Sequence, residues 1–239
     1  MCATIADMPS GEIKTAGSIR ARVRAEMIDE IKTVARRHLA TDGANLSLRA
    51  VARDMGMVSS ALYRYFASRD DLLTALIIDA YDAIGSAVET ADDAVSDRTD
   101  GRARWLACCR AIRTWALANP SEYALIFGSP VPGYQAPADT TVAAARTPAR
   151  LLLLVSESAQ AGPRTMSIPA GVTRDLEQLT ATGVVPEMDV SLLAVTSIAW
   201  IHIFGAVSFE LFGQLNNVVF DRDGYFDLQC AMMADLIGL

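Results

Sequence analysis

Histidine and cysteine are scarce in this chain, which has two histidines and four cysteines among 239 residues. Only Cys108 and Cys109 are close in sequence, and they are adjacent rather than two residues apart as in many zinc-binding motifs. So few candidate ligands argue against a metal site, and the cysteine pattern argues against a disulfide framework. We therefore expect reduced thiols, no metal and a cytoplasmic location.

Motifs of the common enzyme classes are missing as well. The chain has no glycine-rich phosphate-binding loop, no Ser/His/Asp pattern and no His-Glu-x-x-His segment. It also lacks internal repeats and the alternating apolar and polar runs that predict strands. The sequence therefore predicts an all-α protein that is not an enzyme and uses no cofactor.

A signal peptide is absent, and one apolar segment raises the question of a membrane. Residues 1–17 carry acidic side chains and no long apolar run, so we predict a flexible N-terminal arm. Residues 190–209 contain no Asp, Glu, Lys or Arg and have the length of a membrane span. However, His202 and several hydroxyl side chains interrupt them, and no Lys or Arg flanks them. We interpret the segment as a helix buried in protein, without a membrane.

Charge is distributed unevenly along the chain, whose net charge is −7. Residues 1–70 hold 11 Lys and Arg against 8 Asp and Glu, which gives +3, whereas residues 71–239 hold 10 against 20, which gives −10. The local field decides which partner a surface attracts. The N-terminal third is therefore compatible with a polyanion although the whole chain is acidic.

The N-terminal third contains the pattern of several short helices. A basic helix over about Ser18–Leu39 carries an apolar stripe with spacings of three and four residues. Ser47 is a good N-cap for a second helix, and Gly56 suits the left-handed conformation that ends it. A third helix contains "GMVSSALYRYF", residues 56–66, and Ser68 caps a fourth. Two short helices crossing at a tight turn are typical of a helix-turn-helix.

The third predicted helix separates packing residues from outward-facing residues. If Leu62 points inward, Val58 and Phe66 fall within about 40° of it and share the inward stripe. The remaining face is small, polar and cationic. Small residues let a helix approach base edges in the major groove, and Tyr and Arg can bond phosphates. A solvated helix face is the alternative, and this stretch alone leaves both open.

The segment "LSLRAVARDMGMVSSALYRYFASRDDLLTAL", residues 46–76, resembles the TetR family of transcriptional regulators. The matching positions are Ser47, Ala52, Gly56, Leu62, Tyr63, Phe66, Ser68, Arg69, Asp70, Leu72 and Leu73. Met57 and Val58 depart from the pattern, which usually has Val and then Ser or Thr. The resemblance implies a DNA-binding domain over residues 18–66, with the start of helix four to about residue 80. The DNA-contact candidates are Ser47, Arg49, Ser59, Ser60, Tyr63, Arg64, Tyr65 and Arg69.

Residues 67–239 contain further helical segments, including one over about 188–215, and we expect Pro148 to kink or break its helix. Two stretches, 115–134 and 200–213, resemble the effector domain named for a Trp-His-Gly motif, here Trp200, His202 and Gly205. This resemblance implies an all-helical ligand-binding and dimerisation domain, a homodimer on palindromic double-stranded DNA, and a small-molecule effector.

The long helix supports a dimer independently. Apolar residues line both of its sides, so one side can pack against the helices of the same chain and the other against a second subunit. A thick core in a monomer is the alternative. The interface candidates are Trp200, Phe204, Val207, Leu211, Phe226, Cys230, Met233 and Ile237. A mostly apolar ligand cavity is predicted to be lined by Trp105, Cys109, Ile112, Tyr123, Phe127 and His202, although for each residue taken singly plain core is the favoured alternative.

The leading hypothesis is a repressor released from its operator by a small, largely apolar molecule. The alternative is a helical protein that binds a small molecule or a partner without specific DNA binding.

Overall fold

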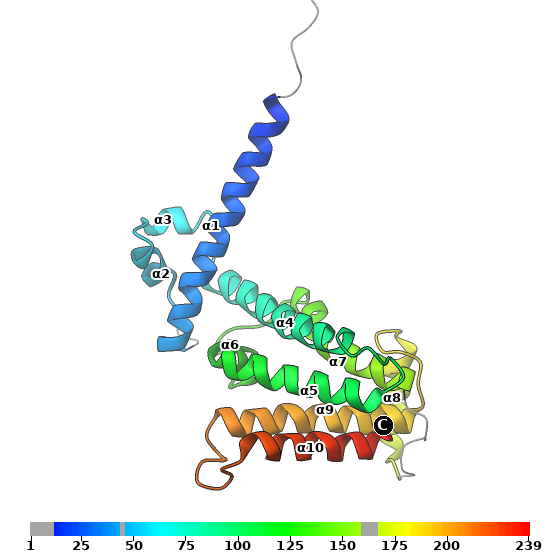
Figure 1. Cartoon of the computed structure of the whole chain (residues 1–239). Coiled ribbons are helices and arrows are strands. Elements are labelled where there is room, and N and C mark those ends of the chain that lie inside the picture. Colours follow the sequence, from blue (N-terminus) through cyan, green and yellow to red (C-terminus); the bar gives the residue numbers. More distant parts are fainter. Residues whose placement is uncertain (1–11, 44–45, 159–166) are drawn as a thin grey trace, which may run out of the picture. The chain divides into compact units, whose positions relative to one another are not determined.

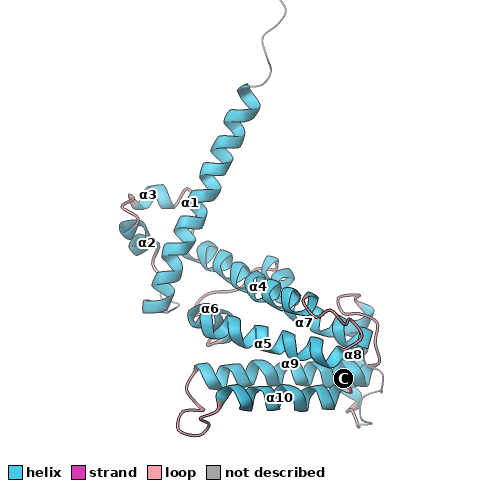
Figure 2. Cartoon of the chain, viewed as in Figure 1, coloured by secondary structure: helices cyan, strands magenta, loops and turns pink. Residues whose placement is uncertain are grey.

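The computed structural model describes residues 12–43, 46–158 and 167–239, and in these ranges the chain is helical with no strand (Figure 2). The all-α prediction is thus confirmed for the described chain. The helices form two compact units, Met1–Leu73 and Thr74–Leu239. Each unit has its own buried core and is described by itself.

The first unit contains α1 (Glu12–Asp42), α2 (Leu48–Asp54), α3 (Ser59–Leu62) and the start of α4 (Arg69–Asp93). α2 packs against both α1 and α3. Their shared core consists of apolar side chains from every helix: Ile31, Val34, Ala35, Leu39, Leu46, Leu48, Val51, Ala52, Leu62, Phe66, Leu72 and Leu73. The apolar stripe predicted on the first helix therefore faces this core.

The first helix begins earlier than the sequence pattern predicts. α1 begins at Glu12, so residues 12–17, predicted to belong to the flexible arm, are helical. The predicted helix was placed where apolar residues repeat at spacings of three and four, and this repeat begins after residue 17. The remainder of the predicted arm, residues 1–11, lies outside the described residues.

The turn between α2 and α3 depends on one glycine. Gly56 has φ +66°, as predicted, and follows the C-cap residue Met55. The Gly56 N–H donates to Arg53 O at 3.0 Å, and the Met57 N–H donates to Ala52 O at 2.8 Å. These two bonds form a Schellman motif, which satisfies the last carbonyls of α2 and reverses the chain.

The start of α4 is fixed by a reciprocal cap. The Asp71 N–H donates to Ser68 Oγ at 3.0 Å, and the Ser68 N–H donates to Asp71 Oδ2 at 3.0 Å. Such a capping box satisfies two backbone donors that the first turn of a helix leaves unpaired. The prediction that Ser68 caps this helix is confirmed.

The second unit contains the rest of α4 and six further helices: α5 (Gly101–Ala118), α6 (Pro120–Phe127), α7 (Asp139–Ser158), α8 (Ala170–Ala181), α9 (Val190–Leu211) and α10 (Arg222–Ile237). α9 contacts α5, α7, α8 and α10, and α10 lies beside it at one edge of the unit (Figure 1). By length and composition alone, α9 could cross a membrane. Leu193, Ala199 and Ile203 on it are fully buried, as expected for a core helix.

Pro148 does not break its helix, contrary to one of the two predicted outcomes. It lies inside α7, which continues to Ser158. Because proline has no N–H, the carbonyl of Ala144 lacks the donor that a regular helix supplies four residues later.

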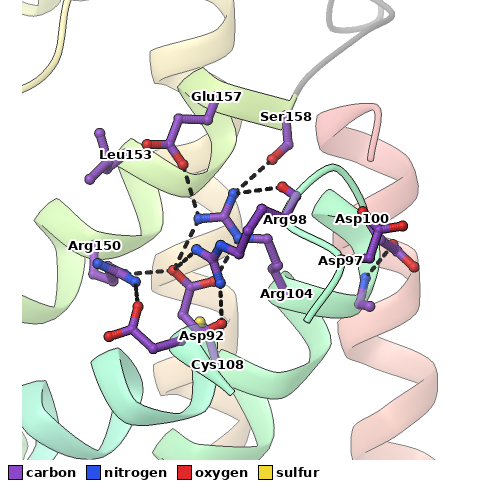
Figure 3. A network of polar contacts seen from close by, with 12 residues as sticks. Asp92, Asp97, Arg98, Asp100, Arg104, Cys108, Arg150, Leu153, Glu157 and Ser158 are labelled. Atoms are coloured by element: carbon purple, nitrogen blue, oxygen red, sulfur yellow. Dashed lines mark hydrogen bonds and ion pairs between the residues drawn. The ribbon is translucent and has the colours of Figure 1, made fainter. Parts of the chain in front are cut away.

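A buried ion-pair network joins three helices of the second unit (Figure 3). Asp92, near the end of α4, is fully buried and accepts bonds from Arg104 of α5, Arg98 of the intervening turn and Arg150 of α7. Burial would raise the pKa of Asp92, but the hydrogen bonds from Arg104 and Arg98 outweigh it and hold this pKa at about 2. Arg104 also donates to Glu157 of α7 at 3.0 Å. No sequence pattern predicted this network, since Arg150 and Glu157 of α7 are more than 50 residues away from their partners.

Candidate nucleic-acid interface

The recognition segment exposes a polar and cationic face. Leu62 and Phe66 are buried, as predicted, whereas Ser60, Tyr63 and Arg64 are exposed. Ser59 is half-buried. The segment therefore anchors itself with its apolar residues and leaves hydroxyl and guanidinium groups accessible.

The prediction that Val58 shares the inward stripe is wrong, because Val58 is 70% exposed. α3 begins only at Ser59, and Val58 is the N-cap with extended backbone angles of φ −71° and ψ 137°. Helical periodicity does not extend to a residue outside the helix. Val58 has no side-chain oxygen, so it makes no side-chain capping bond at this position.

The helical part of this segment is shorter than predicted. α3 ends at Leu62, and Tyr63, Arg64 and Tyr65 form a turn. The Arg64 N–H donates to Ala61 O at 3.2 Å and the Tyr65 N–H donates to Leu62 O at 2.9 Å, which are the tighter bonds of a 3₁₀ turn. This turn still presents Tyr63 and Arg64 outward.

α1 supports the recognition turn through one arginine. The Arg24 guanidinium donates from Nη2 to Arg64 O at 3.3 Å, and its Cζ lies 5.1 Å from the centre of the Tyr65 ring. A guanidinium over an aromatic face is attracted by the ring electrons. The ring of Tyr65 is therefore in contact with Arg24, whereas Arg64 is exposed and its guanidinium has no ion-pair partner among the described residues.

Four of the predicted DNA contacts meet in one surface depression of about 550 Å³. Ser47, Arg49, Tyr63 and Arg69 all line it. Arg69 is partly structural, because its Nε donates to Leu46 O at 3.1 Å and so joins the start of α4 to the chain before α2. The tertiary structure thus unites residues from three separate segments.

The predicted role of Ser47 as a helix cap is wrong in one respect. It occupies the N-cap position of α2 with extended backbone, but its side chain makes no capping hydrogen bond. Its side chain is exposed, which leaves the hydroxyl accessible within the depression.

The residues predicted for a ligand cavity do not face one common space. Trp105, Cys109, Ile112 and Tyr123 have no accessible surface, so they line no cavity large enough for a water molecule. Tyr123 instead donates to Phe204 O at 2.8 Å, and burial raises its pKa, so its phenol is neutral. The two remaining candidates differ from these four: Phe127 is half-buried and packs on Tyr123 and Phe204, and His202 is exposed on α9.

Most residues predicted at a dimer interface are covered by the chain itself. Those buried within the second unit are Phe204, Val207, Phe226, Cys230 and Ile237. Trp200, Leu211 and Met233 are half-buried. Both faces of α9 are apolar, so periodicity alone could not say which one the chain itself covers, and the interface stays a prediction.

Different apolar residues of these two helices are exposed. They are Ile198, Ile201 and Phe209 on α9, its C-cap residue Phe212, and Tyr225, Leu228 and Met232 on α10. At about 100° per residue, each set forms one stripe along its helix.

Comparison with known proteins identifies both units. Residues 31–76 match the family model of bacterial regulatory proteins of the tetR family, and residues 105–233 match the tetracyclin repressor-like C-terminal domain. The chain is 37% identical over 228 residues to the HTH-type transcriptional regulators Mb1846 of Mycobacterium bovis and Rv1816 of Mycobacterium tuberculosis. Each alignment covers 91% of this chain and 95% of the relative.

Solved structures agree with this assignment. The crystal structure of the regulatory protein SCO4313 has a TM-score of 0.75 and 33% identity, and it covers 90% of this chain and 98% of that one. PfmR, a TetR family transcriptional regulator from Thermus thermophilus, shares the fold with a TM-score of 0.53 at 18% identity, covering 87% and 96%. The chain therefore belongs to the tetR family and is a helix-turn-helix transcriptional regulator, not an enzyme.

Proposed function

We propose that this regulator is a cytoplasmic, homodimeric repressor that binds a palindromic operator and is released by a small, uncharged, largely apolar molecule. The observation that carries the DNA-binding part is the exposed Tyr63 and Arg64 turn beside the depression lined by Ser47, Arg49 and Arg69. In this proposal Arg64, Tyr63, Arg49 and the serines contact DNA. Tyr65 holds the turn against α1 through Arg24, and Arg69 joins the start of α4 to the chain before α2.

The exposed stripes on α9 and α10 support the dimer. Seven large apolar side chains are exposed on two adjacent helices, and a soluble monomer rarely leaves such a continuous apolar surface uncovered. A second copy of the chain is the occupant that we propose, because two helices from each subunit would form a four-helix contact with two-fold symmetry.

Gly205 marks the place of closest approach in this proposed dimer. It lies between Ile201 and Phe209 on the exposed stripe, and a Cβ added to it would meet nothing within 4 Å in its own chain. A glycine inside an exposed helix is otherwise unfavourable by about 1 kcal/mol relative to alanine.

Trp200, His202 and Gly205 all lie on α9, so we assign this domain to the Trp-His-Gly type.

We propose that the effector enters a cavity of about 460 Å³ between α4, α6, α7 and the loop after α6. It is lined by Ile77, Tyr81, Leu125, Ile126, Gly128, Ser129, Pro130, Val131, Tyr134, Ala136, Thr140, Thr141 and Ala144. Its volume suits a small molecule. None of the lining side chains is charged, and an ion buried there would lack a counter-charge, which favours an uncharged ligand.

Two of the polar groups at this cavity are the ones that we propose for ligand binding. The carbonyl of Ala144, a lining residue, lacks its usual donor because of Pro148, and we propose that it accepts a bond from the ligand. Burial raises the pKa of Tyr81, so its phenol is neutral; its O–H donates to Ile126 O at 3.4 Å, which leaves the oxygen able to accept a second bond. A ligand with hydrogen-bond donors, such as hydroxyls or an amide, on an apolar body fits both groups.

The cavity touches α4, the helix that begins in the DNA-binding unit. Thr74 of α4 shares a hydrogen bond of 2.9 Å with Tyr134, which lines the cavity. A ligand that binds better to one placement of α4 shifts the population toward that state. The two recognition segments of a dimer must match half-sites about 34–36 Å apart. Release from DNA follows if the favoured placement of α4 changes the distance between these segments so that they no longer match.

A gel shift with the DNA upstream of the protein's own reading frame tests the proposal. The intact protein should retard this DNA specifically at moderate salt, and Arg64→Ala should weaken the binding at least tenfold. Arg37→Ala is the matched control, because it removes the same charge from the far side of α1 and should leave the binding near that of the wild type. Equal binding by the wild type and Arg64→Ala, with the same salt dependence, would contradict the placement of the recognition turn.

A further inference from the structure

We infer that α1 adds a second DNA contact outside the helix-turn-helix, made by Arg20 with a phosphate beside the segment that α3 occupies. The inference rests on the proposed operator binding and extends it to a part of the chain that the tetR family match, residues 31–76, leaves out.

One stripe of α1 changes its chemistry along the helix. At about 100° per residue, Arg20, Arg24 and Ile31 fall within roughly 40° of one another. Ile31 is fully buried where the stripe packs on the core of the first unit. Residues 19–26 are all exposed, and there the stripe carries arginine. The face of α1 that meets the core thus continues as a cationic face beyond it.

Arg24 shows where this cationic face lies. It contacts the backbone oxygen of Arg64 and the ring of Tyr65, so the stripe passes directly beside the recognition turn. Arg20 is one helical turn further, about 6 Å along the axis. Arg20 and Arg24 therefore form a row of guanidinium groups along the side of α1 that passes the backbone of the recognition turn.

The acidic residues of this part of α1 avoid the same face. Glu26, Asp29 and Glu30 lie at least about 120° around the helix from Arg24. Arg22 also lies on the far side, where it pairs with Glu26 at 3.6 Å. The side of α1 beside the recognition turn thus carries arginines without acidic neighbours on the same stripe, whereas the opposite side carries the Arg22–Glu26 ion pair.

A DNA phosphate is the occupant that fits this row. The guanidinium of Arg20 has no ion-pair partner among the described residues, and arginine binds phosphate well. The exposed end of a helix that has little tertiary support is only marginally stable in water. Contact with a phosphate would stabilise it and lengthen the footprint of the protein on DNA.

Salt-dependent binding of the full chain to its operator tests the inference. Each phosphate contact contributes about 0.9 to the slope of log K against log salt, so Arg20→Ala should reduce the slope by roughly 1.8 for a dimer. Because phosphates carry no sequence information, binding to unrelated DNA should weaken by the same factor. Arg20→Lys should restore most of the slope. Arg22→Ala, which removes an equal charge from the far face, should leave it unchanged.

The outcomes separate this inference from the proposed function. If the wild type does not bind the operator specifically, the proposed function fails. If the wild type binds and Arg20→Ala keeps the full slope, or loses no more than Arg22→Ala does, the α1 contact alone is overturned. A loss confined to the operator would also overturn it, since that pattern indicates base reading rather than phosphate binding.

Discussion

Arg104 donates two hydrogen bonds to the buried carboxylate of Asp92, from Nε to Oδ1 at 2.7 Å and from Nη2 to Oδ2 at 3.0 Å. Arg98 and Arg150 bond the same carboxylate, at 3.0 and 2.6 Å. One acidic side chain thus fixes the relative positions of α4, α5 and α7. Its removal leaves three arginines facing one another.

Asp92→Asn should therefore destabilise the second unit strongly. Breaking a buried ion pair by removing one partner costs about 3–5 kcal/mol. Chemical denaturation followed by circular dichroism measures the loss. Asp93→Asn is the control, because Asp93 is exposed and contacts only Arg150 of these arginines, so it should cost under about 1 kcal/mol. Similar losses in both variants would show that Asp92 has no special role.

The same carboxylate should make stability depend on acid pH. Folding lowers the pKa of Asp92 from its ordinary value of 3.8 to about 2. A carboxyl whose pKa is lower in the folded than in the unfolded chain stabilises the fold at pH values above its unfolded pKa. The contribution of Asp92 is therefore complete above about pH 5 and disappears as the pH falls from 4 toward 2. The difference corresponds to roughly 2 kcal/mol. The difference in the free energy of unfolding between the wild type and Asp92→Asn should become smaller as the pH falls through this range. A constant difference would refute the lowered pKa of Asp92.

Gly56→Ala should weaken the first unit and its binding to DNA. No atom would clash with the added Cβ, but a φ of +66° is unfavourable for alanine by about 1–2 kcal/mol. Operator affinity should fall with the loss of the turn between α2 and α3. Gly171→Ala, at an open position without positive φ, should be neutral or slightly stabilising. An unchanged melting profile for Gly56→Ala would mean that the turn tolerates another conformation.

Phe209→Asp should convert the proposed dimer into a monomer without unfolding it. Phe209 is 57% exposed in the single chain, so its replacement costs that chain little but places a charge in the proposed interface. Sedimentation equilibrium measures the mass. Val142→Asp is the control, because Val142 is 81% exposed on α7, away from the two stripes, and should leave the dimer intact. A dimer that persists with Phe209→Asp would place the interface elsewhere.

Thr74 and Tyr134 should be energetically coupled. Thr74→Val and Tyr134→Phe each remove one partner of their 2.9 Å hydrogen bond and keep the side-chain shape. Each should cost about 1 kcal/mol, and the double variant should cost less than the sum. Unfolding in urea provides the three values. Full additivity would show that this bond does not join the loop to α4.

Local patterns in the sequence were reliable where local chemistry decides the structure. Ser68 caps α4 and Gly56 adopts positive φ because each depends on its immediate neighbours. The prediction that Val58 is buried was wrong because it extended helical periodicity to a residue that precedes the start of α3. Pro148 does not break α7, which packs against α5 and α9 and continues although the hydrogen bond to the carbonyl of Ala144 is missing.

The sequence by itself determined the all-helical class, the helix-turn-helix and its exposed Tyr63 and Arg64, because apolar spacing, caps and turn glycines act over a few residues. Only the tertiary structure decided which face of α9 is buried, since both are apolar and the neighbouring helices select one. It also brought Asp92 and Arg150 together and placed Arg24 beside Tyr65. These contacts join residues far apart in the chain, and no periodicity records them.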